Sequence, residues 1–308
     1  MATNDKRAYT AGKFALDLNG DFAGWVSSIE GGHATADVVT EKVGSDLIQH
    51  KHIAGVKYED ISVNCGTSMS KSFYEWVQAS IDHKVTRFDG AVITADFNHK
   101  EVGRLNFFQA LVTEVGFPAL DASSKDAAKM TIKFAPEYTR MISKTGANIK
   151  GELGKGQQKK WLPANFKLEI DGLGDACKHV NKVEALTIKQ KVVENPVGEL
   201  RDCQKEPAHI EFPNLVITLS EAFADKLYEW HEDFVIKGHN SNDKEKTGSL
   251  QYLSSDLKPL FTLEFKGLGI FKMTPEKVEA HSENIRRVKC EMYCEQITFK
   301  AEGDAVWS

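Results

Sequence analysis

The sequence contains two similar units, and this duplication limits the folds that the chain can adopt. The triplet Tyr-Glu-Trp occurs at Tyr74–Trp76 and again at Tyr228–Trp230, 154 positions apart in a chain of 308 residues. The segment VKYEDISVNCG from Val56 aligns with IEFPNLVITLS from Ile210 at the same offset. Because several segments recur in the same order with a period of half the chain, the sequence predicts two domains of similar fold.

The later segments of each unit align at an offset of 158 instead. GRLNFFQALVTEV from Gly103 aligns with FTLEFKGLGIFKM, and AKMTIKF from Ala128 aligns with RRVKCEMY. The four extra residues fall in the polar stretch KGHNSNDKEKTG, which predicts a longer surface loop in the second unit. The expected boundaries are residues 10–142 for the first domain, 143–162 for a linker rich in Gly and Lys, and 163–300 for the second domain. A fully extended linker of this length spans about 60–70 Å and would restrict the placement of the domains very little.

Each unit is expected to be mainly β with one flanking helix. A short alternating strand runs into an Asn-Gly turn near residue 19 and an Asp-Gly turn near residue 171, and strands of about ten residues or more follow. Such long strands need paired edges. The predicted fold class is therefore mainly β (α+β), with two tandem β-barrel or β-sandwich domains.

Apolar residues at helical spacing mark one helix in each unit. Ser72 and Glu75 have the spacing of a capping box, and Ser220 is the expected start of the second helix. The expected inner faces, which would seal each sheet, consist of Phe73, Trp76, Val77 and Ile81 in the first unit and Leu227, Trp230, Phe234 and Val235 in the second.

The composition is that of an ordinary soluble protein. Lys and Arg number 39 against 44 Asp and Glu, which gives a net charge of −5. This mild acidity argues against a protein that coats duplex DNA, although a conduit through which nucleic acid passes stays possible. No stretch reads as a signal peptide or membrane helix, so synthesis in a cytosol and no membrane partner are expected. Five cysteines at irregular spacing favour reduced thiols.

Residues with metal-binding or catalytic potential have a structural interpretation in each case. Cys290 and Cys294 would lie about 13 Å apart on one strand face, too far for one zinc ion, and packing is the favoured role. His50 and His52 have strand spacing for a metal but no third ligand that recurs in the second unit. The run GELGKGQQKK has Gln157 and Gln158 in place of the Lys and the Ser or Thr of a phosphate-binding loop, and it is expected to be linker. Neither an enzyme activity nor a cofactor nor a metal site is predicted.

The segment order and several stretches resemble the tail tube protein family of T4-like contractile phages. In the first unit the resemblance is carried by FALDLNGDFAGWVSSIEGG, IAGVKYEDISVNCGTSMSKSFYEWV and RLNFFQALVTEV, followed by SSKDAAKMTIKF. The second unit is a more divergent match, through FKLEIDGLG, IEFPNLVITL, KLYEWHEDFV and FTLEFKGLGIFKM. The same family supplies the inner tubes of phage-derived injection particles and is structurally related to the type VI secretion tube protein.

The resemblance implies a structural protein of a virion tail or injection particle, made in the bacterial host cytoplasm. Its β-barrel domains would join into six-domain rings that stack into a hollow tube for DNA or effectors, which pass without specific binding. Implied partners are further copies of the chain, a tail sheath, and baseplate or tail-terminator proteins. The implied inter-ring loops map to 41–55 and 194–209, with Lys42, Asp46, His50, His52, Glu199, Arg201 and Lys205 as their candidate contact residues.

Two tube domains in one chain depart from the usual single-domain subunit. Three chains could form a pseudo-six-fold ring, or six chains could form two stacked rings, and the sequence does not decide between them. A tube-like baseplate adaptor or tube-end protein is therefore an alternative to the bulk tube subunit. Two further alternatives are a monomeric two-domain β binding module and, with less support, a secreted effector carried by one tube-like domain.

Overall fold

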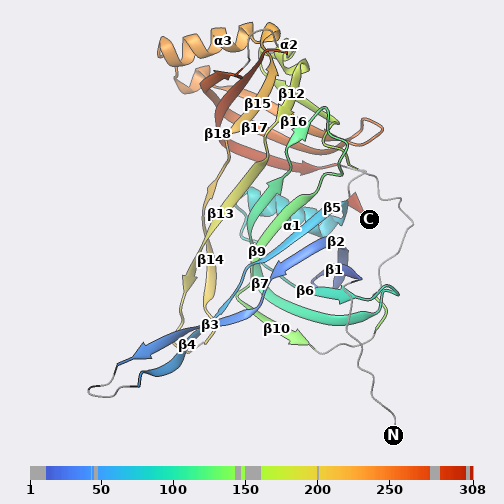
Figure 1. Cartoon of the computed structure of the whole chain (residues 1–308), viewed down its shortest axis with the longest axis vertical. Helices are drawn as coiled ribbons and strands as arrows, with labels where there is room; N and C mark the ends of the chain where they lie inside the picture. Colours follow the sequence, from blue (N-terminus) through green and yellow to red (C-terminus); the bar gives the residue numbers. More distant parts are fainter. Residues whose placement is uncertain are drawn as a thin grey trace.

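The computed structural model describes residues 12–42, 44, 48–142, 147–149, 161–199, 201–277, 285–302 and 306–307. Two β units lie one above the other, and a long two-stranded hairpin of the upper unit runs down beside the lower one (Figure 1). The upper unit is the second half of the chain. The fold is mainly β, as predicted.

The first unit is a closed barrel of six strands. Around the barrel the order is β1, β2, β5, β9, β7 and β6, and β6 pairs with β1 to close the ring. Closure removes the open strand edges that a flat sheet would expose. The strands of this unit are β1 (Lys13–Leu18), β2 (Asp21–Gly31), β3 (Ala34–Glu41), β4 (His50–Tyr58), β5 (Ile61–Ser70), β6 (Phe88–Ala95), β7 (Glu101–Phe117), β8 (Leu120–Asp121), β9 (Met130–Ala135) and β10 (Tyr138–Ile142).

The second unit repeats this strand order but leaves the barrel open. Its sheet runs β11, β16, β17, β18, β15 and β12, which correspond in turn to β1, β6, β7, β9, β5 and β2. Among the described residues, no strand pairing joins β11 to β12. The strands of this unit are β11 (Phe166–Ile170), β12 (Val180–Val183), β13 (Leu186–Asn195), β14 (Gln204–Glu211), β15 (Leu215–Ser220), β16 (Lys246–Leu253), β17 (Pro259–Pro275) and β18 (Arg287–Ala301).

The second barrel is open because a short helix replaces the first half of the strand that corresponds to β2. In the first unit, the turn at Asn19-Gly20 leads directly into β2, whose first residues pair with β1. At an offset of 154, those residues correspond to α2 (Gly174–Lys178). The aromatic strand formers Phe22 and Trp25 are replaced there by Ala176 and His179, which removes two strong β-forming side chains. The predicted turn at Asp171-Gly172 forms, but it leads into α2 and not into a strand that pairs with β11.

The predicted helices form and cover one side of each unit. Helix α1 (Lys71–Ile81) begins after Ser70, whose hydroxyl accepts a hydrogen bond from the Phe73 backbone N–H. The capping residue is thus Ser70 and not Ser72, because the chain already turns into the helix at Lys71. The second helix follows Ser220 as η1 (Glu221–Phe223), α3 (Asp225–His231) and the π-helical turn η2 (Glu232–Ile236). A further 3₁₀ turn, η3 (Asn242–Lys244), precedes β16.

The two segments predicted to be long loops are largely β-hairpins. The described residues of 41–55 and 194–209 belong to the hairpins β3–β4 and β13–β14. The prediction missed these strands because polar side chains occupy both faces, as in HKHIAGVKY, so the period-two apolar pattern that identifies a half-buried strand is absent.

The two units share one hydrophobic core, so their placement is fixed by packing. Strand β13 of the second unit pairs with β7 of the first, and β8 of the first pairs with β12 of the second. Trp161, in the predicted linker, is 2% exposed and packs against Tyr252 and Phe261. The expectation of loosely placed domains is therefore wrong, and the linker segment around Trp161 belongs to the core. Near the C-terminus, β19 (Val306–Trp307) pairs in parallel with β5.

Candidate assembly interface

The predicted helix residues occupy the inner helix faces with one difference. Seven of the eight side chains are buried: Phe73, Trp76, Val77, Ile81, Leu227, Trp230 and Phe234. Val235, the residue that corresponds to Ile81 in the repeat, is instead 43% exposed, whereas Ile81 is 4% exposed. The core assignment of Val235 is therefore wrong for a single chain. The cause lies in what covers Ile81.

Ile81 is covered by the hairpin of the second unit. Strand β13 pairs antiparallel with the end of β7, from Leu186 opposite Phe117 to Lys189 opposite Glu114. This places Ile188 and Ile210 beside Ile81 and Val115, where they line the same small space. Ile188 is 3% exposed. The junction thus combines a sheet extension with an apolar layer, which is the usual basis of a stable strand-addition interface.

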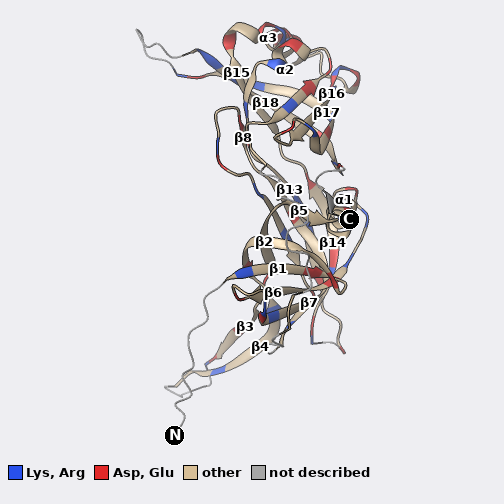
Figure 2. Ribbon diagram, turned by 90° about the vertical axis from the view of Figure 1, so that its right-hand side faces the viewer, with Lys and Arg blue, Asp and Glu red and all other residues tan. Residues whose placement is uncertain are grey.

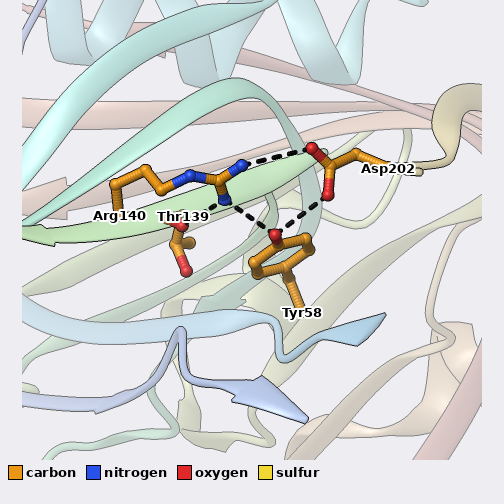
Figure 3. A network of polar contacts seen from close by, with 4 residues as sticks. All are labelled: Tyr58, Thr139, Arg140 and Asp202. Atoms are coloured by element: carbon orange, nitrogen blue, oxygen red, sulfur yellow. Dashed lines mark hydrogen bonds and ion pairs between the residues drawn. The ribbon is translucent and has the colours of Figure 1, made fainter. Parts of the chain in front are cut away.

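A polar network fastens the tip of the β13–β14 hairpin to the first unit (Figure 3). The Tyr58 hydroxyl donates to Asp202 Oδ1 over 2.9 Å and accepts from Arg140 Nη1 over 2.7 Å. Arg140 Nη2 lies 3.3 Å from Asp202 Oδ2. Partial burial raises the pKa of the Tyr58 phenol, and its hydrogen bond to Asp202 adds to the shift. The network joins β4 and β10 of the first unit to the hairpin tip of the second.

A second set of contacts holds β14 near the barrel. Arg87 Nη2 lies 2.8 Å from Glu206 Oε2 and also donates to the Lys205 carbonyl over 2.8 Å. The Lys205 backbone N–H donates to Glu137 Oε1 over 3.0 Å. Lys205 is 6% exposed. The prediction that Lys205 lies in an inter-ring loop is therefore wrong, because this residue of β14 is buried against the first unit.

The other predicted loop residues lie at or near the hairpin tips and are exposed. Lys42, His50 and His52 lie in the first hairpin, and Glu199 and Arg201 lie in the second. Asp46 lies outside the described residues. The sequence does not predict the roles of Arg87, Glu137, Arg140 and Asp202, because their ion pairs and hydrogen bonds are not repeated at corresponding positions of the two units.

The β3–β4 hairpin and the end of β17 correspond to the docked hairpin and its receiving edge, but no described strand pairs with either of them in this way. Every side chain of β3 is exposed, and the β3–β4 hairpin projects away from the barrel in Figure 1. Strand β17 pairs with β16 only as far as Leu268, and no described strand pairs with that edge from Gly269 to Pro275. Val38, Ile48 and Ile53 on the hairpin are 62%, 74% and 68% exposed. These two surfaces form the candidate assembly interface.

The remaining candidate groups show packing and no assembled site. Burial raises the pKa of both Cys65 and Cys290 to about 12, so these thiols stay protonated and unreactive at neutral pH. Within the described part of the chain, no cluster of three or more His, Cys, Asp or Glu side chains is placed to hold a metal ion. None of the helices formed by the described residues has the length and apolar character needed to cross a bilayer.

Comparison with known proteins gives a family match for the first unit. The family described as T4-like virus tail tube protein gp19 matches residues 10–140, somewhat less than half of the chain. No curated protein matches the sequence.

Three similar solved structures each match less than half of this chain but nearly all of their own length. A chain of the sheath–tube complex of an extracellular contractile injection system, PVC, is 16% identical over 45% of this chain and 94% of its own, with a TM-score of 0.40. A chain of the anti-feeding prophage tube-terminating cap is 19% identical over 46% and 99%, with a TM-score of 0.39. Hcp1 from Flavobacterium johnsoniae is 16% identical over 44% and 96%, with a TM-score of 0.26. The family match therefore confirms that the first unit, residues 10–140, is similar to the tail tube proteins of T4-like viruses.

Proposed function

We propose that this chain is a structural subunit that assembles into rings of tube-type domains around a hollow conduit. The observation that carries the proposal is the junction between its own two units, in which the hairpin of one domain extends the sheet of the next. The family match of residues 10–140 supports the same function. A sheet extension of this kind propagates when each domain offers both a hairpin and a receiving edge.

The proposed setting is a virion tail or injection particle, with further copies of the chain as the main partners. A tail sheath and baseplate or terminator proteins are the other proposed partners, by the resemblance of the first unit. The net charge of −5 supports passage of DNA without adhesion, because phosphates are repelled by a surface of like charge. Acidic and basic residues are interspersed along both units in Figure 2, which fits a wall that offers no strongly basic track.

A tube-end piece or adaptor is the form of this function favoured by the difference between the units. A closed barrel and an open one would alternate around a ring of six domains built from three chains. Such a ring has three-fold symmetry with two unlike domain positions, which suits a junction between a three-fold and a six-fold structure.

Electron microscopy and light scattering of the purified protein test the proposal. We expect closed rings or tubes in negative stain and a concentration-dependent increase in mass above the 34.3 kDa of one chain. A stable monomer at every concentration and salt level would contradict the proposal and would favour the two-domain binding module.

A further inference from the structure

The two hairpins are equivalent residue by residue, although only one of them is docked. In each hairpin a bulge falls at the same place, before Val38 opposite Ile53 and before Val192 opposite Pro207. Both strands of the two hairpins are related by a constant offset of 154. The docked residue Lys189 therefore corresponds to Thr35, and the free hairpin presents the same backbone in the same register.

The receiving edges are equivalent as well. Val115 lies opposite Ile132, and its counterpart Met273 lies opposite Cys290, at an offset of 158 on both strands. The edge of β7 that receives β13 thus corresponds to Lys272–Pro275 of β17. The counterpart of Phe117, where β7 ends, is Pro275, where β17 ends. Proline has no N–H to donate and is tolerated at such a ladder end.

We infer that β3 of one copy pairs antiparallel with β17 of a second copy, with Thr35 opposite Lys272 and Ala34 opposite Met273. This contact between copies repeats the β13–β7 junction within the chain, and we call it the trans junction. It rests on the proposed function, because it is the contact through which copies would join into a ring. It specifies the partner, the strands and the register.

The exposure of Val235 in the second unit is consistent with this register. Within the chain, Ile188 and Ile210 line the same small space as Ile81. The corresponding residues of the trans junction are Ala34 and Val56 from the free hairpin and Val235 from the helix of the receiving unit. Val235 is 43% exposed in the single chain, and it would lose this exposure on docking, as Ile81 does. The trans junction therefore accounts for an apolar side chain left at the surface.

The charged residues change together between the two junctions. Within the chain, Arg87 pairs with Glu206 over 2.8 Å. Arg87 precedes β6 and corresponds to Glu245 before β16, by the register of Phe88 with Ala110 and of Lys246 with Leu268. Glu206 corresponds to His52. Within the chain, the receiving unit carries the cation and the hairpin carries the carboxylate. In the trans junction, the receiving unit carries the carboxylate of Glu245 and the hairpin carries His52, so the two sides exchange roles and remain complementary.

The tip of the free hairpin is less polar than the tip of the docked hairpin, and the residues that would face it differ in the same way. Asp202 at the tip corresponds to Ile48, which is 74% exposed. Its partners Tyr58 and Arg140 correspond to Phe212 and Thr298 of the receiving unit.

The phenol, the guanidinium and the carboxylate of this polar network are therefore replaced together, so that neither charge is left without its partner. Coordinated replacement of this kind also prevents either hairpin from docking equally well at the other site. Each chain contains one junction and contributes one to a neighbour, so a ring of six domains would contain three copies.

Cysteine cross-linking tests the register directly. In T35C/K272C, both new thiols lie on the solvent face of the proposed ladder and fall within disulfide distance between copies. Under mild oxidation we expect covalent dimers and trimers with no larger species. A34C/K272C is the matched control, because side chains of neighbouring ladder positions point to opposite faces. It should cross-link at least about tenfold more slowly.

The outcomes separate this inference from the proposed function. Rings in electron micrographs without a T35C/K272C cross-link would overturn the trans junction and leave ring assembly intact. The absence of both rings and cross-links would overturn both. A ladder of cross-linked species beyond the trimer would overturn the three-copy ring while supporting the β3–β17 pairing.

Transplanting the charge pair of the intrachain junction provides a second, independent test. H52E places a carboxylate against Glu245 and should raise the concentration needed for assembly at least about tenfold. Adding E245R recreates the Arg87–Glu206 pair with its orientation preserved, and H52E/E245R should assemble within about threefold of the unmodified protein. Weakening by H52E without rescue, or no effect of H52E, would contradict the proposed position of the hairpin.

Discussion

The hairpins β13–β14 and β3–β4 have the same register and the same bulge, yet one is built into the molecule and the other is exposed. The difference lies in their surroundings. β13 pairs with the end of β7 in the same chain, whereas no described strand pairs with the equivalent edge of β17. In a chain with two similar domains, the same contact can therefore be formed within the chain in one place and be left open for a partner in the other.

The largest expected effect is a loss of folding stability when an Asp is placed in the docked hairpin but not when it is placed in the free one. Ile188→Asp places an unpaired carboxylate in a site that is 3% exposed, and we expect it to lower the free energy of unfolding by about 4 kcal/mol or more. Ala34→Asp, at the equivalent position of the free hairpin, should change it by less than about 0.5 kcal/mol. Urea unfolding of the dilute protein measures both. Equal losses would mean that the two hairpins are packed alike.

The helix residues below the hairpins give the next largest contrast. Ile81→Ala removes a side chain packed beneath β13 and should cost about 2–4 kcal/mol of stability. Val235→Ala should cost less than about 1 kcal/mol in the monomer, because Val235 is already 43% exposed. Thermal unfolding of both variants below the assembly concentration checks this. The comparison fails if Val235→Ala is as destabilising as Ile81→Ala.

The smallest effect concerns the network at the docked hairpin tip. Tyr58→Phe removes the hydroxyl between Arg140 and Asp202 and should cost about 1 kcal/mol at neutral pH. Because the pKa of Tyr58 is raised above its ordinary value of 10.0, its contribution is present below about pH 10 and is lost as the pH rises through the folded-state pKa.

The stability difference between the unmodified protein and Tyr58→Phe should therefore shrink at alkaline pH. Urea unfolding of both proteins between about pH 8 and 11 measures it, and the variant itself controls for the other tyrosines. A difference that stays constant over this range would show that the Tyr58 hydroxyl does not act through the network.

Much of the architecture could be predicted because it depends on local pattern. The helical spacing of Phe73, Trp76 and Val77 identifies α1, and the repeated segments give the order of the long strands. The opening of the second barrel could not be read in the same way. It depends on the replacement of Phe22 and Trp25 by Ala176 and His179, which turns half a strand into a short helix.

Most of the interface could not be predicted from the sequence, because it depends on contacts between elements that are far apart in the chain. Every side chain of β3 is exposed, and β13 alternates only at Leu186 and Ile188, so periodicity could not identify these segments as paired strands. Arg87, Arg140 and Asp202 stand far apart in the chain and meet only when β13 lies along β7. Val235 matches the core pattern of Ile81, but it is 43% exposed because no described strand covers it.

The most direct test of the account is backbone hydrogen exchange along the two equivalent edges, measured below and above the assembly concentration. We predict slow exchange for Glu114–Phe117 at every concentration, since β13 covers that edge. For the Lys272–Thr274 amides that point away from β18, we predict fast exchange in the monomer and slow exchange in the assembled protein. Slow exchange of these amides in the monomer, or fast exchange within assembled rings, would contradict the claim that a second copy completes this edge.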